Sequence, residues 1–199
     1  MHLSILGVTP QKEKQFFRKK IFTVEDLMRF LPRKYYDFRN PKTIKDAQVG
    51  EIEAIIGTVV DVKAYNKVYK VTIEDSNKWT MEMLWFNGFQ YISKFIDIGN
   101  TYIFYGKVQV PPGFFKKQMV SPKFSIDIDK YKKIMPIYSS IQGMGEDYLL
   151  DKINKGLAIT SKDEYLDIDI INEFGLIKEY EMQRIFHQPL TMEEIERAK

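Results

Sequence analysis

Residues 51–86 read EIEAIIGTVVDVKAYNKVYKVTIEDSNKWTMEMLWF, and the spacing of apolar residues in this stretch decides the fold. Apolar and polar residues alternate, which is the period of a half-buried β-strand rather than that of a helix. The even positions are apolar in residues 51–62 except at Thr58, and the odd positions are apolar in residues 69–73 and 79–86. The pattern predicts three meandering strands, the first two joined by a tight turn near Asn66. The positions expected to face the core are Ile52, Ala54, Ile56, Val60, Val62, Tyr69, Val71, Ile73, Trp79, Met81, Met83 and Trp85.

The sequence that follows supplies the rest of a small barrel. A short helix is expected over residues 89–98, followed by strands over residues 101–110 and 115–121 that Pro111-Pro112-Gly113 separates. Three meandering strands, a helix and two further strands is the order of the OB-fold, a five-stranded Greek-key barrel that commonly binds single-stranded nucleic acid. We therefore expect an α+β protein with an OB-fold barrel over residues 49–130.

Helical patterns flank this barrel and divide the chain into three predicted parts. Residues 1–48 form an N-terminal segment with two short helices, over residues 11–20 and 23–31, that resemble a helical hairpin. Thr23 is the expected N-cap of the second helix, because Asp26 follows it at the spacing of a capping box.

Residues 131–199 form a helical linker whose apolar surface is too small to fold alone, so we expect it to pack on the barrel or on parts beyond this chain. Its last helix starts with a capping box of Thr191 and Glu194, and the helix is still in progress at Lys199. We therefore expect the polypeptide to continue. The helical segments expected here are residues 146–159, 168–174, 178–186 and 191–199.

The composition is that of a soluble globular protein and excludes several classes of function. Hydrophobic residues make up 44% and charged residues 29% of the chain, and no apolar run approaches the roughly 18 residues that cross a bilayer. The absence of cysteine excludes disulfides, thiolate metal sites and cysteine nucleophiles. Because the N-terminus lacks the pattern of a signal peptide, we expect a cytoplasmic protein without a membrane partner.

Several motifs of catalytic and cofactor-binding sites are missing from the sequence. It contains no phosphate-binding loop, no dinucleotide-binding glycine fingerprint and no metalloprotease or serine-hydrolase motif. His187 precedes a proline at a predicted helix end, which favours a structural role over metal binding. The acid pairs Asp127/Asp129 and Asp167/Asp169 alternate in polar stretches that are typical of solvated turns. We therefore expect no catalytic residues, no metal site and no cofactor in this chain.

Positive charge and aromatic rings point to nucleic acid. Residues 1–50 carry 11 Lys and Arg against five Asp and Glu, whereas residues 131–199 carry nine against 13. Aromatic residues interleaved with cations suit unpaired nucleotides, because bases stack on rings while Lys and Arg contact phosphates. Trp85 lies on the core side of its strand by parity, so Phe86 points the other way and is expected to be partly exposed. The rings near cations are Tyr35, Tyr36, Tyr65 and Tyr69, and Trp85, Phe86, Phe89 and Tyr91 form a further cluster. The expected phosphate-contacting residues are Arg33, Lys34, Lys63, Lys67, Lys70, Lys107, Lys116 and Lys117.

Five short motifs occur in a set order along the chain. Residues 3–39 read LSILGVTPQKEKQFFRKKIFTVEDLMRFLPRKYYDFR, and WFN (85–87), YGKV (105–108), PIY (136–138) and FHQP (186–189) follow. In order and spacing they resemble the wedge region of RecG helicases, whose start reads Leu-Gly-Val/Ile, Thr-Val-x-Asp-Leu and Pro-Arg-x-Tyr. The resemblance spans essentially the whole chain. One departure is Ser-Pro at residues 121–122, where the family has His-Pro.

The resemblance implies a protein of DNA repair and recombination that remodels stalled replication forks and Holliday junctions. In such a protein the OB wedge splits strands, while two RecA-like motor lobes beyond this chain use ATP and Mg to pull duplex DNA. Phe86 corresponds to a ring that stacks on an unpaired base at the junction. The second stacking ring is Phe89 or Tyr91, because the segment before Gly99 is one residue longer here than in the family. The implied partners are branched DNA, single-stranded DNA and the motor lobes of the same polypeptide.

Two other functions remain compatible with the sequence. One is a free-standing OB-fold protein that binds single-stranded nucleic acid without any motor. The other is a protein-interaction barrel whose aromatic patch contacts a partner chain. DNA binding would separate the protein-interaction barrel from the two nucleic-acid functions. Continuation of the gene into an ATPase would separate the RecG-like wedge from the free-standing single-strand-binding protein.

Overall fold

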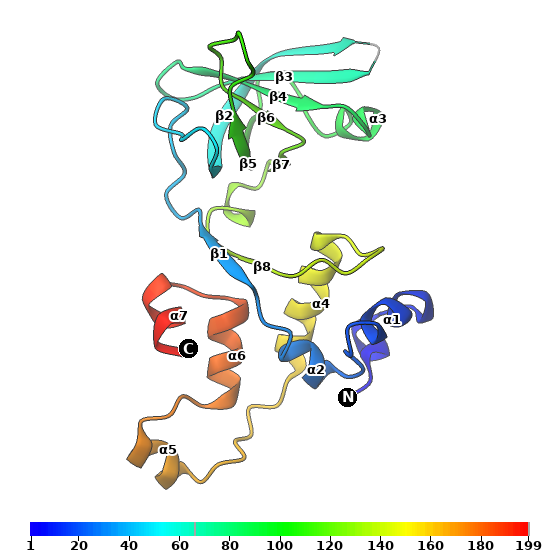
Figure 1. The fold of residues 1–199 in the computed structure, drawn as a ribbon, viewed down its shortest axis with the longest axis vertical. Coiled ribbons are helices and arrows are strands. Elements are labelled where there is room, and N and C mark those ends of the chain that lie inside the picture. The colour runs from blue at the N-terminus through cyan, green and yellow to red at the C-terminus, as the bar shows by residue number, and fades with distance from the viewer. Residues whose placement is uncertain (66, 199) are drawn as a thin grey trace. The chain divides into compact units, whose positions relative to one another are not determined.

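The computed structural model describes residues 1–65 and 67–198, and of Phe89 it describes only the backbone. The turn predicted near Asn66 therefore lies outside the described residues. The chain combines a β-barrel with short helices, which confirms the predicted α+β class (Figure 1).

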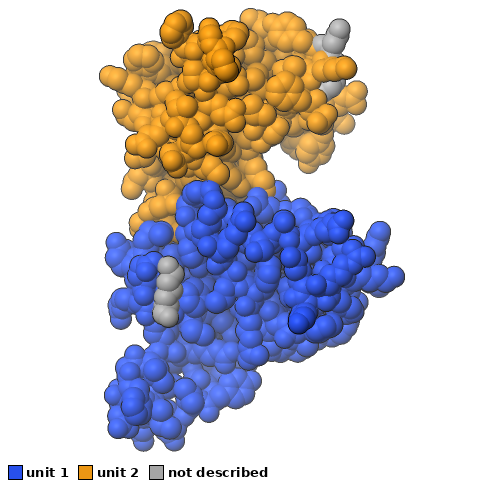
Figure 2. Space-filling view, viewed as in Figure 1, with its two compact units in different colours: residues 1–36, 136–199 blue, residues 37–135 orange. Residues whose placement is uncertain are grey.

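The chain forms two compact units (Figure 2). Unit 1 contains residues 1–36 and 136–199, and unit 2 contains residues 37–135. The two ends of the chain thus fold together, whereas the sequence divided them into separate parts. The first boundary lies before residue 48 because Ile44 belongs to the barrel core, where its backbone N–H donates to the buried carboxylate of Asp75 at 2.8 Å.

Unit 2 is a closed barrel with the predicted OB-fold order of elements. Its strands pair in the ring β2–β3–β4–β6–β5, which closes through the pairing of β2 with β5, and β7 adds to β5. Neighbours in the ring are antiparallel except β4 and β6, which run parallel. Along the chain, helix α3 lies between β4 and β5, which are the third and fourth barrel strands in sequence order, as expected of an OB-fold. The elements are β2 (Ile52–Tyr65), β3 (Val68–Glu74), β4 (Thr80–Trp85), α3 (Phe89–Ile92), β5 (Thr101–Gln109), β6 (Gln118–Val120), β7 (Lys123–Ser125) and the 3-10 turn η2 (Ile128–Lys130).

Up to Val59 the side of β2 that faces the core differs from the predicted one, whereas Val62 packs against the core as predicted. Odd positions such as Ile55 and Val59 are buried, and most of the even positions are half-buried or exposed. The predicted parity was wrong because Gly57 lies on the inner side, where a Cβ would come within 2.7 Å of the Ile73 Cδ1 atom. A bulge between Val59 and Asp61 then reverses which positions face inward.

The predicted inner faces of β3 and β4 are confirmed. Their inward residues, together with side chains from β2, β5 and β6, form the barrel core. Trp79 was expected on this face but is 50% exposed, because it lies before the first residue of β4. The confirmed core residues of these two strands are Tyr69, Val71, Ile73, Met81, Met83 and Trp85.

Two elements of unit 2 are shorter than predicted. The helix expected over residues 89–98 is helical only over α3 and continues as turns. The last strand was expected from Phe115, but β6 begins at Gln118 because Phe114 to Lys117 form a loop outside the sheet.

Unit 1 is helical, and its helices come from both ends of the chain. Helices α2 and α4 pack on a shared core in which Phe16, Leu27 and Ile153 are fully buried. The chain leaves unit 1 through β1 and returns through β8, two paired strands that the sequence did not predict. The elements are η1 (Leu3–Leu6), α1 (Pro10–Phe17), α2 (Val24–Met28), β1 (Lys34–Asp37), β8 (Ile134–Ile137), α4 (Glu146–Ile159), α5 (Ile168–Phe174), α6 (Glu179–His187) and α7 (Met192–Ala198).

Both predicted capping boxes are present. The Thr23 hydroxyl accepts the backbone N–H of Asp26 at 3.1 Å, and the Asp26 carboxylate accepts the N–H of Thr23 at 3.0 Å. In the same way Thr191 accepts the N–H of Glu194 at 3.1 Å. These local bonds satisfy amide groups that the first turn of a helix leaves unpaired.

His187 has the structural role predicted for it. Its side chain is buried at the end of α6, where Nδ1 is 2.8 Å from the Tyr138 hydroxyl and Nε2 is 2.9 Å from the Met28 carbonyl oxygen. Burial holds the pKa of His187 below its usual value, although the contact with Met28 opposes this shift.

Candidate nucleic-acid interface

The candidate interface begins where β4 ends. Met83 and Trp85 point into the core, so Phe86 emerges on the other side and is 47% exposed. The predicted partial exposure of Phe86 is thereby confirmed. Asn87 and Gly88 follow, and Gly88 has φ +70°, a conformation that lets the backbone turn sharply here. The ring thus directly follows the last residue of β4, and about half of the residue is exposed to solvent.

Helix α3 and the turn after it bring further aromatic rings to the same end of β4. Tyr91 is 68% exposed, and its ring centroid lies 4.8 Å from that of Phe95, which is 49% exposed. Phe95 was not predicted as a candidate ring, because it lay within the longer helix expected over residues 89–98. The side chain of Phe89 lies outside the described residues. The choice of the second stacking ring therefore stays a prediction.

The β2–β3 hairpin supplies cations near these rings. In the register of β3 against β4, Tyr69 lies opposite Trp85, so the free end of the hairpin and the end of β4 are on one side of the barrel. Tyr65 is 57% exposed at this end, and Lys63 and Lys67 are exposed beside it. Lys63 forms a 2.9 Å ion pair with Asp61, and the hydrogen bond with that carboxylate raises the pKa of Lys63.

The remaining lysines expected at phosphates have different surroundings. Lys107 and Lys116 are exposed. Lys70 is half-buried and forms a 3.1 Å ion pair with Glu82.

Lys117 does not fit the expected phosphate contact. Its ammonium group donates to the carbonyl oxygens of Ile44 at 2.9 Å, Lys45 at 2.7 Å and Ala47 at 2.7 Å. An ammonium group has three donors, and all of them are used here. Lys117 therefore holds residues 44–47 against the beginning of β6, a role that sequence spacing could not reveal.

Arg33 and Lys34 belong to unit 1, whereas the other expected phosphate-contacting residues belong to unit 2. Arg33 is exposed, and Lys34 donates to the Tyr36 hydroxyl, with its amine 4.5 Å from the Tyr36 ring centroid. Tyr35 is half-buried and donates from its hydroxyl to the Phe186 carbonyl at 2.9 Å. Burial raises the pKa of Tyr35 to about 12. Tyr35 thus serves the packing of unit 1.

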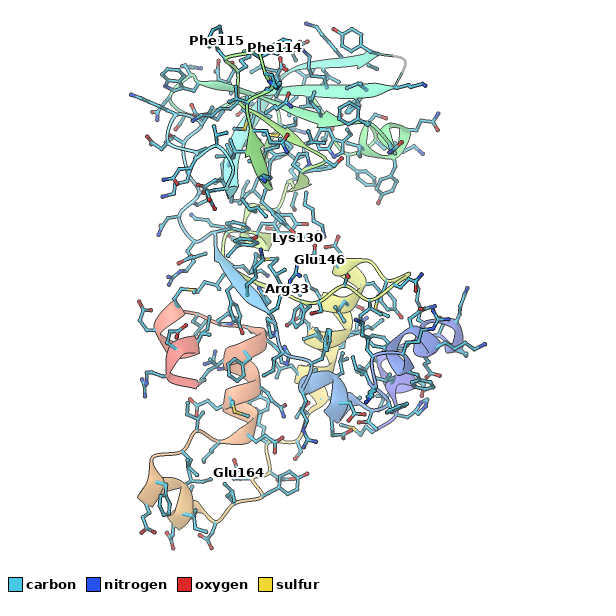
Figure 3. All side chains as sticks on the ribbon, in the orientation of Figure 1. Arg33, Phe114, Phe115, Lys130, Glu146 and Glu164 are labelled. Atoms are coloured by element: carbon cyan, nitrogen blue, oxygen red, sulfur yellow. The ribbon has the colours of Figure 1, made fainter. Side chains whose placement is uncertain are left out.

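Two exposed rings were not predicted from the sequence. Phe114 is 66% exposed and Phe115 is fully exposed, in the loop between β5 and β6 (Figure 3). Two features of the sequence could have indicated this loop. Pro111-Pro112-Gly113 ends the preceding strand, and residues 114–117 do not alternate between apolar and polar as a strand would.

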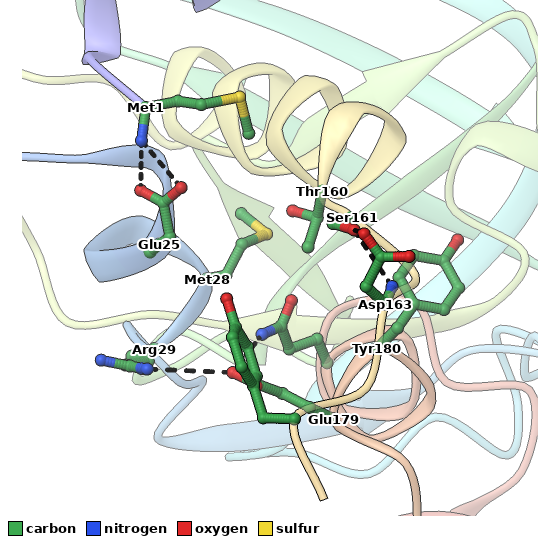
Figure 4. Close-up of a pocket in the computed structure, with 11 residues that line it drawn as sticks. Met1, Glu25, Met28, Arg29, Thr160, Ser161, Asp163, Glu179 and Tyr180 are labelled. Atoms are coloured by element: carbon green, nitrogen blue, oxygen red, sulfur yellow. Dashed lines mark hydrogen bonds and ion pairs between the residues drawn. The ribbon is translucent and has the colours of Figure 1, made fainter.

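A pocket of about 340 Å³ lies in unit 1, between α2, α6 and the chain after α4 (Figure 4). Glu25, Asp163 and Glu179 line it, and Arg29 lies 3.9 Å from the Glu179 carboxylate. The side-chain oxygen of Gln183 is buried there without a hydrogen-bond partner among the described residues. Carboxylates repel phosphate, so this pocket does not belong to the candidate nucleic-acid interface.

The described residues contain no group of three or more His, Asp or Glu side chains arranged to hold a metal ion. The acid pairs serve local structure: Asp127 accepts the backbone N–H of Asp129, and Asp167 accepts that of Asp169. Within the same residues, no helix has both the length and the apolar character that a bilayer crossing requires.

Comparisons with known proteins agree on one family. Residues 4–160 match the family model of the RecG wedge domain. The ATP-dependent DNA helicase RecG of Borreliella burgdorferi is 25% identical over 191 residues, which cover 90% of this chain and 28% of that protein. A structure of RecG bound to a three-way DNA junction matches all of this chain with a TM-score of 0.86 and 21% identity, and the match covers 28% of that chain. The chain therefore spans 28% of the length of each of these two relatives, and the structural match shows that they share a fold.

Proposed function

The chain belongs to the RecG wedge domain family, and from this premise we propose that it binds branched DNA and separates the strands at the junction. The Borreliella relative is a helicase, and the similar RecG structure contains a three-way junction. The parent protein of this chain is then an ATP-dependent helicase of the cytoplasm that remodels stalled forks and Holliday junctions. Its motor lobes bind ATP and Mg, and this chain packs on them.

The exposure of Phe86 carries the proposal. Along β4 the residues Met81, Met83 and Trp85 are almost fully buried, and Phe86 then presents about half of its ring to solvent. A ring at the edge of a rigid barrel can occupy the place of a base that loses its pairing partner, because every base has a face on which an aromatic ring stacks. Tyr91 lies on the adjoining helix and is the second ring in this proposal.

The charge of unit 2 supports the same proposal. Residues 37–135 contain 15 Lys and Arg against 11 Asp and Glu. Lys63 and Lys67 lie at the end of the hairpin beside Phe86, and they are the cations that we assign to phosphate contacts there. Neutralising phosphates releases counterions, so the affinity for DNA must fall as salt rises.

The experiment is a titration of fluorescent forked, duplex and single-stranded DNA with the purified chain, at salt concentrations between about 50 and about 200 mM. We expect the fork to bind most tightly and its affinity to fall with salt. Replacing Lys63 and Lys67 by alanine should reduce the slope of log affinity against log salt by about two. Lys132→Ala, which removes an exposed lysine far along the chain from the hairpin, is the matched control.

Two outcomes of this titration would contradict the proposal. Equal binding of fork and single strand would favour the free-standing single-strand-binding protein over the wedge. A chain that binds no DNA at any salt concentration would overturn the nucleic-acid function and leave the protein-interaction barrel.

A further inference from the structure

A second pair of aromatic rings projects from the barrel, at the loop between β5 and β6. Phe114 is 66% exposed and Phe115 is fully exposed (Figure 3). Single exposed apolar residues are common, but these two adjacent phenylalanines lie outside the core and expose most of their apolar area to water. Lys116 follows them directly and is also exposed.

The loop that carries these rings is held at both ends. At its start Pro111 and Pro112 restrict the backbone, and the N–H of Phe114 donates to the Pro111 carbonyl at 3.1 Å. At its end Lys117 is tied to residues 44–47 by three hydrogen bonds. The rings are therefore presented by a fixed turn and cannot fold back freely onto the barrel. A ring ordered before binding loses less entropy on binding.

The strand register places this loop at the other end of β4 from Phe86. Strands β4 and β6 run parallel, with Glu82 opposite Gln118, so the loop before β6 lies on the side where β4 begins. The Glu82 N–H also donates to the Lys117 carbonyl at 3.2 Å. Since β4 has six residues, the two aromatic sites are separated by roughly 20 Å.

The beginning of β4 has further groups suited to a nucleotide. Trp79 is 50% exposed there, and the Lys45 ammonium lies 5.9 Å from its ring centroid. The nearby carboxylate of Glu74 is paired with Lys78 at 2.7 Å, and Asp75 is buried and accepts backbone N–H groups. The carboxylates of Glu74 and Asp75 are thus engaged, while Lys116 and the two phenylalanine rings are exposed.

We propose that the β5–β6 loop is a second contact for single-stranded DNA, in which Phe114 and Phe115 stack on unpaired bases and Lys116 contacts the adjoining phosphate. This inference rests on the proposed function and extends it: a strand parted at Phe86 continues across the barrel and is gripped again at this loop. Nucleic acid fits better than a protein partner because the exposed Lys116 directly follows the rings and unit 2 carries an excess of positive charge.

The test compares forks whose single-stranded arm is about two nucleotides long with forks whose arm has about 16, the upper site size of one OB-fold. Phe114→Ala/Phe115→Ala should weaken binding of the long-arm fork by about five- to 150-fold per lost stack, and leave the short-arm fork unaffected. Melting should not change, because both rings are exposed. Phe115→Trp should retain binding, and Ile126→Ala, which truncates an apolar residue that is 63% exposed, is the control.

The outcomes separate this inference from the proposed function. If the wild-type chain prefers forks but the double variant binds long and short arms like wild type, the second contact is refuted and the proposed function stands. If the wild-type chain shows no preference for forks, cross-linking of an iodouracil-labelled single strand tests whether the second contact exists. Cross-links at Phe114 or Phe115 support the second contact without the junction function, and no cross-link there overturns it.

Discussion

Trp85 and Phe86 are neighbours in sequence, and they face opposite sides of β4. Trp85 is 4% exposed and its ring lies 5.8 Å from that of Phe124 inside the barrel, whereas Phe86 is 47% exposed. Truncating each ring therefore tests a different property. Each substitution is the control for the other, because both remove a large aromatic side chain and the two positions are adjacent.

We expect Phe86→Ala to weaken fork binding by about 1–3 kcal/mol and to leave melting and duplex binding nearly unchanged, because a stacked base is lost while phosphate contacts remain. Trp85→Ala should lower the stability of unit 2 by about 3–5 kcal/mol. Thermal melts and fork titrations of both variants check this. A large loss of melting temperature in Phe86→Ala would show that the ring stabilises the fold and does not act as a wedge.

A second prediction at this scale concerns His187 and pH. Because burial lowers the pKa of His187 in the folded protein, the unfolded chain binds the proton more readily. The stability that depends on neutral His187 is present above the unfolded pKa of about 6.5 and is lost as the pH falls below it. Unfolding by urea, followed by the circular dichroism of the helices of unit 1, should therefore show lower stability at about pH 5.5 than at about pH 7.5.

The control for this pH effect is the other histidine. His187→Gln should flatten the pH dependence, whereas His2→Gln should preserve it, since the side chain of His2 is 60% exposed. The same pH dependence in wild type and His187→Gln would rule out His187 as its source.

At the scale of elements, the stability of a short helix depends on the hydrogen bonds that cap its first turn. Helix α2 has only five residues, and the bonds between Thr23 and Asp26 close its capping box. Thr23→Ala should destabilise unit 1 by about 0.5–2 kcal/mol. Thr9→Ala is the matched control, because Thr9 stands at the N-cap of α1 without a capping hydrogen bond from its side chain. Equal losses in both variants, measured by urea unfolding, would contradict a specific capping contribution.

Strand β2 shows how one glycine can decide the orientation of an element. Ile55 and Ile56 are both apolar, so the local pattern permits either parity. Gly57 faces Ile73 from the neighbouring strand, and the close approach leaves no room for a side chain. The inner face of β2 up to Val59 was therefore decided by a contact across the sheet, and the bulge after Val59 changes which positions face inward beyond it.

At the scale of the whole molecule, the proposed function divides the work between this chain and its motor. The sequence lacks a phosphate-binding loop, so the purified chain should bind forks but neither hydrolyse ATP nor unwind DNA. A phosphate-release assay with and without forked DNA, together with a strand-displacement assay, measures this. ATP hydrolysis that rises when forked DNA is added would disprove it, provided that a mock purification shows none.

The sequence by itself determined the OB-fold order, the inner faces of β3 and β4, both capping boxes and the exposure of Phe86. All of these depend on side chains a few residues apart, so periodicity and capping rules apply directly. Only the tertiary structure decided the inner face of β2, the joining of residues 1–36 with 136–199, and the use of Lys117 as an anchor. These features depend on contacts between residues far apart in the chain. A lysine bound to three carbonyls and a lysine facing solvent look alike in sequence, because their difference arises only when distant backbone segments meet.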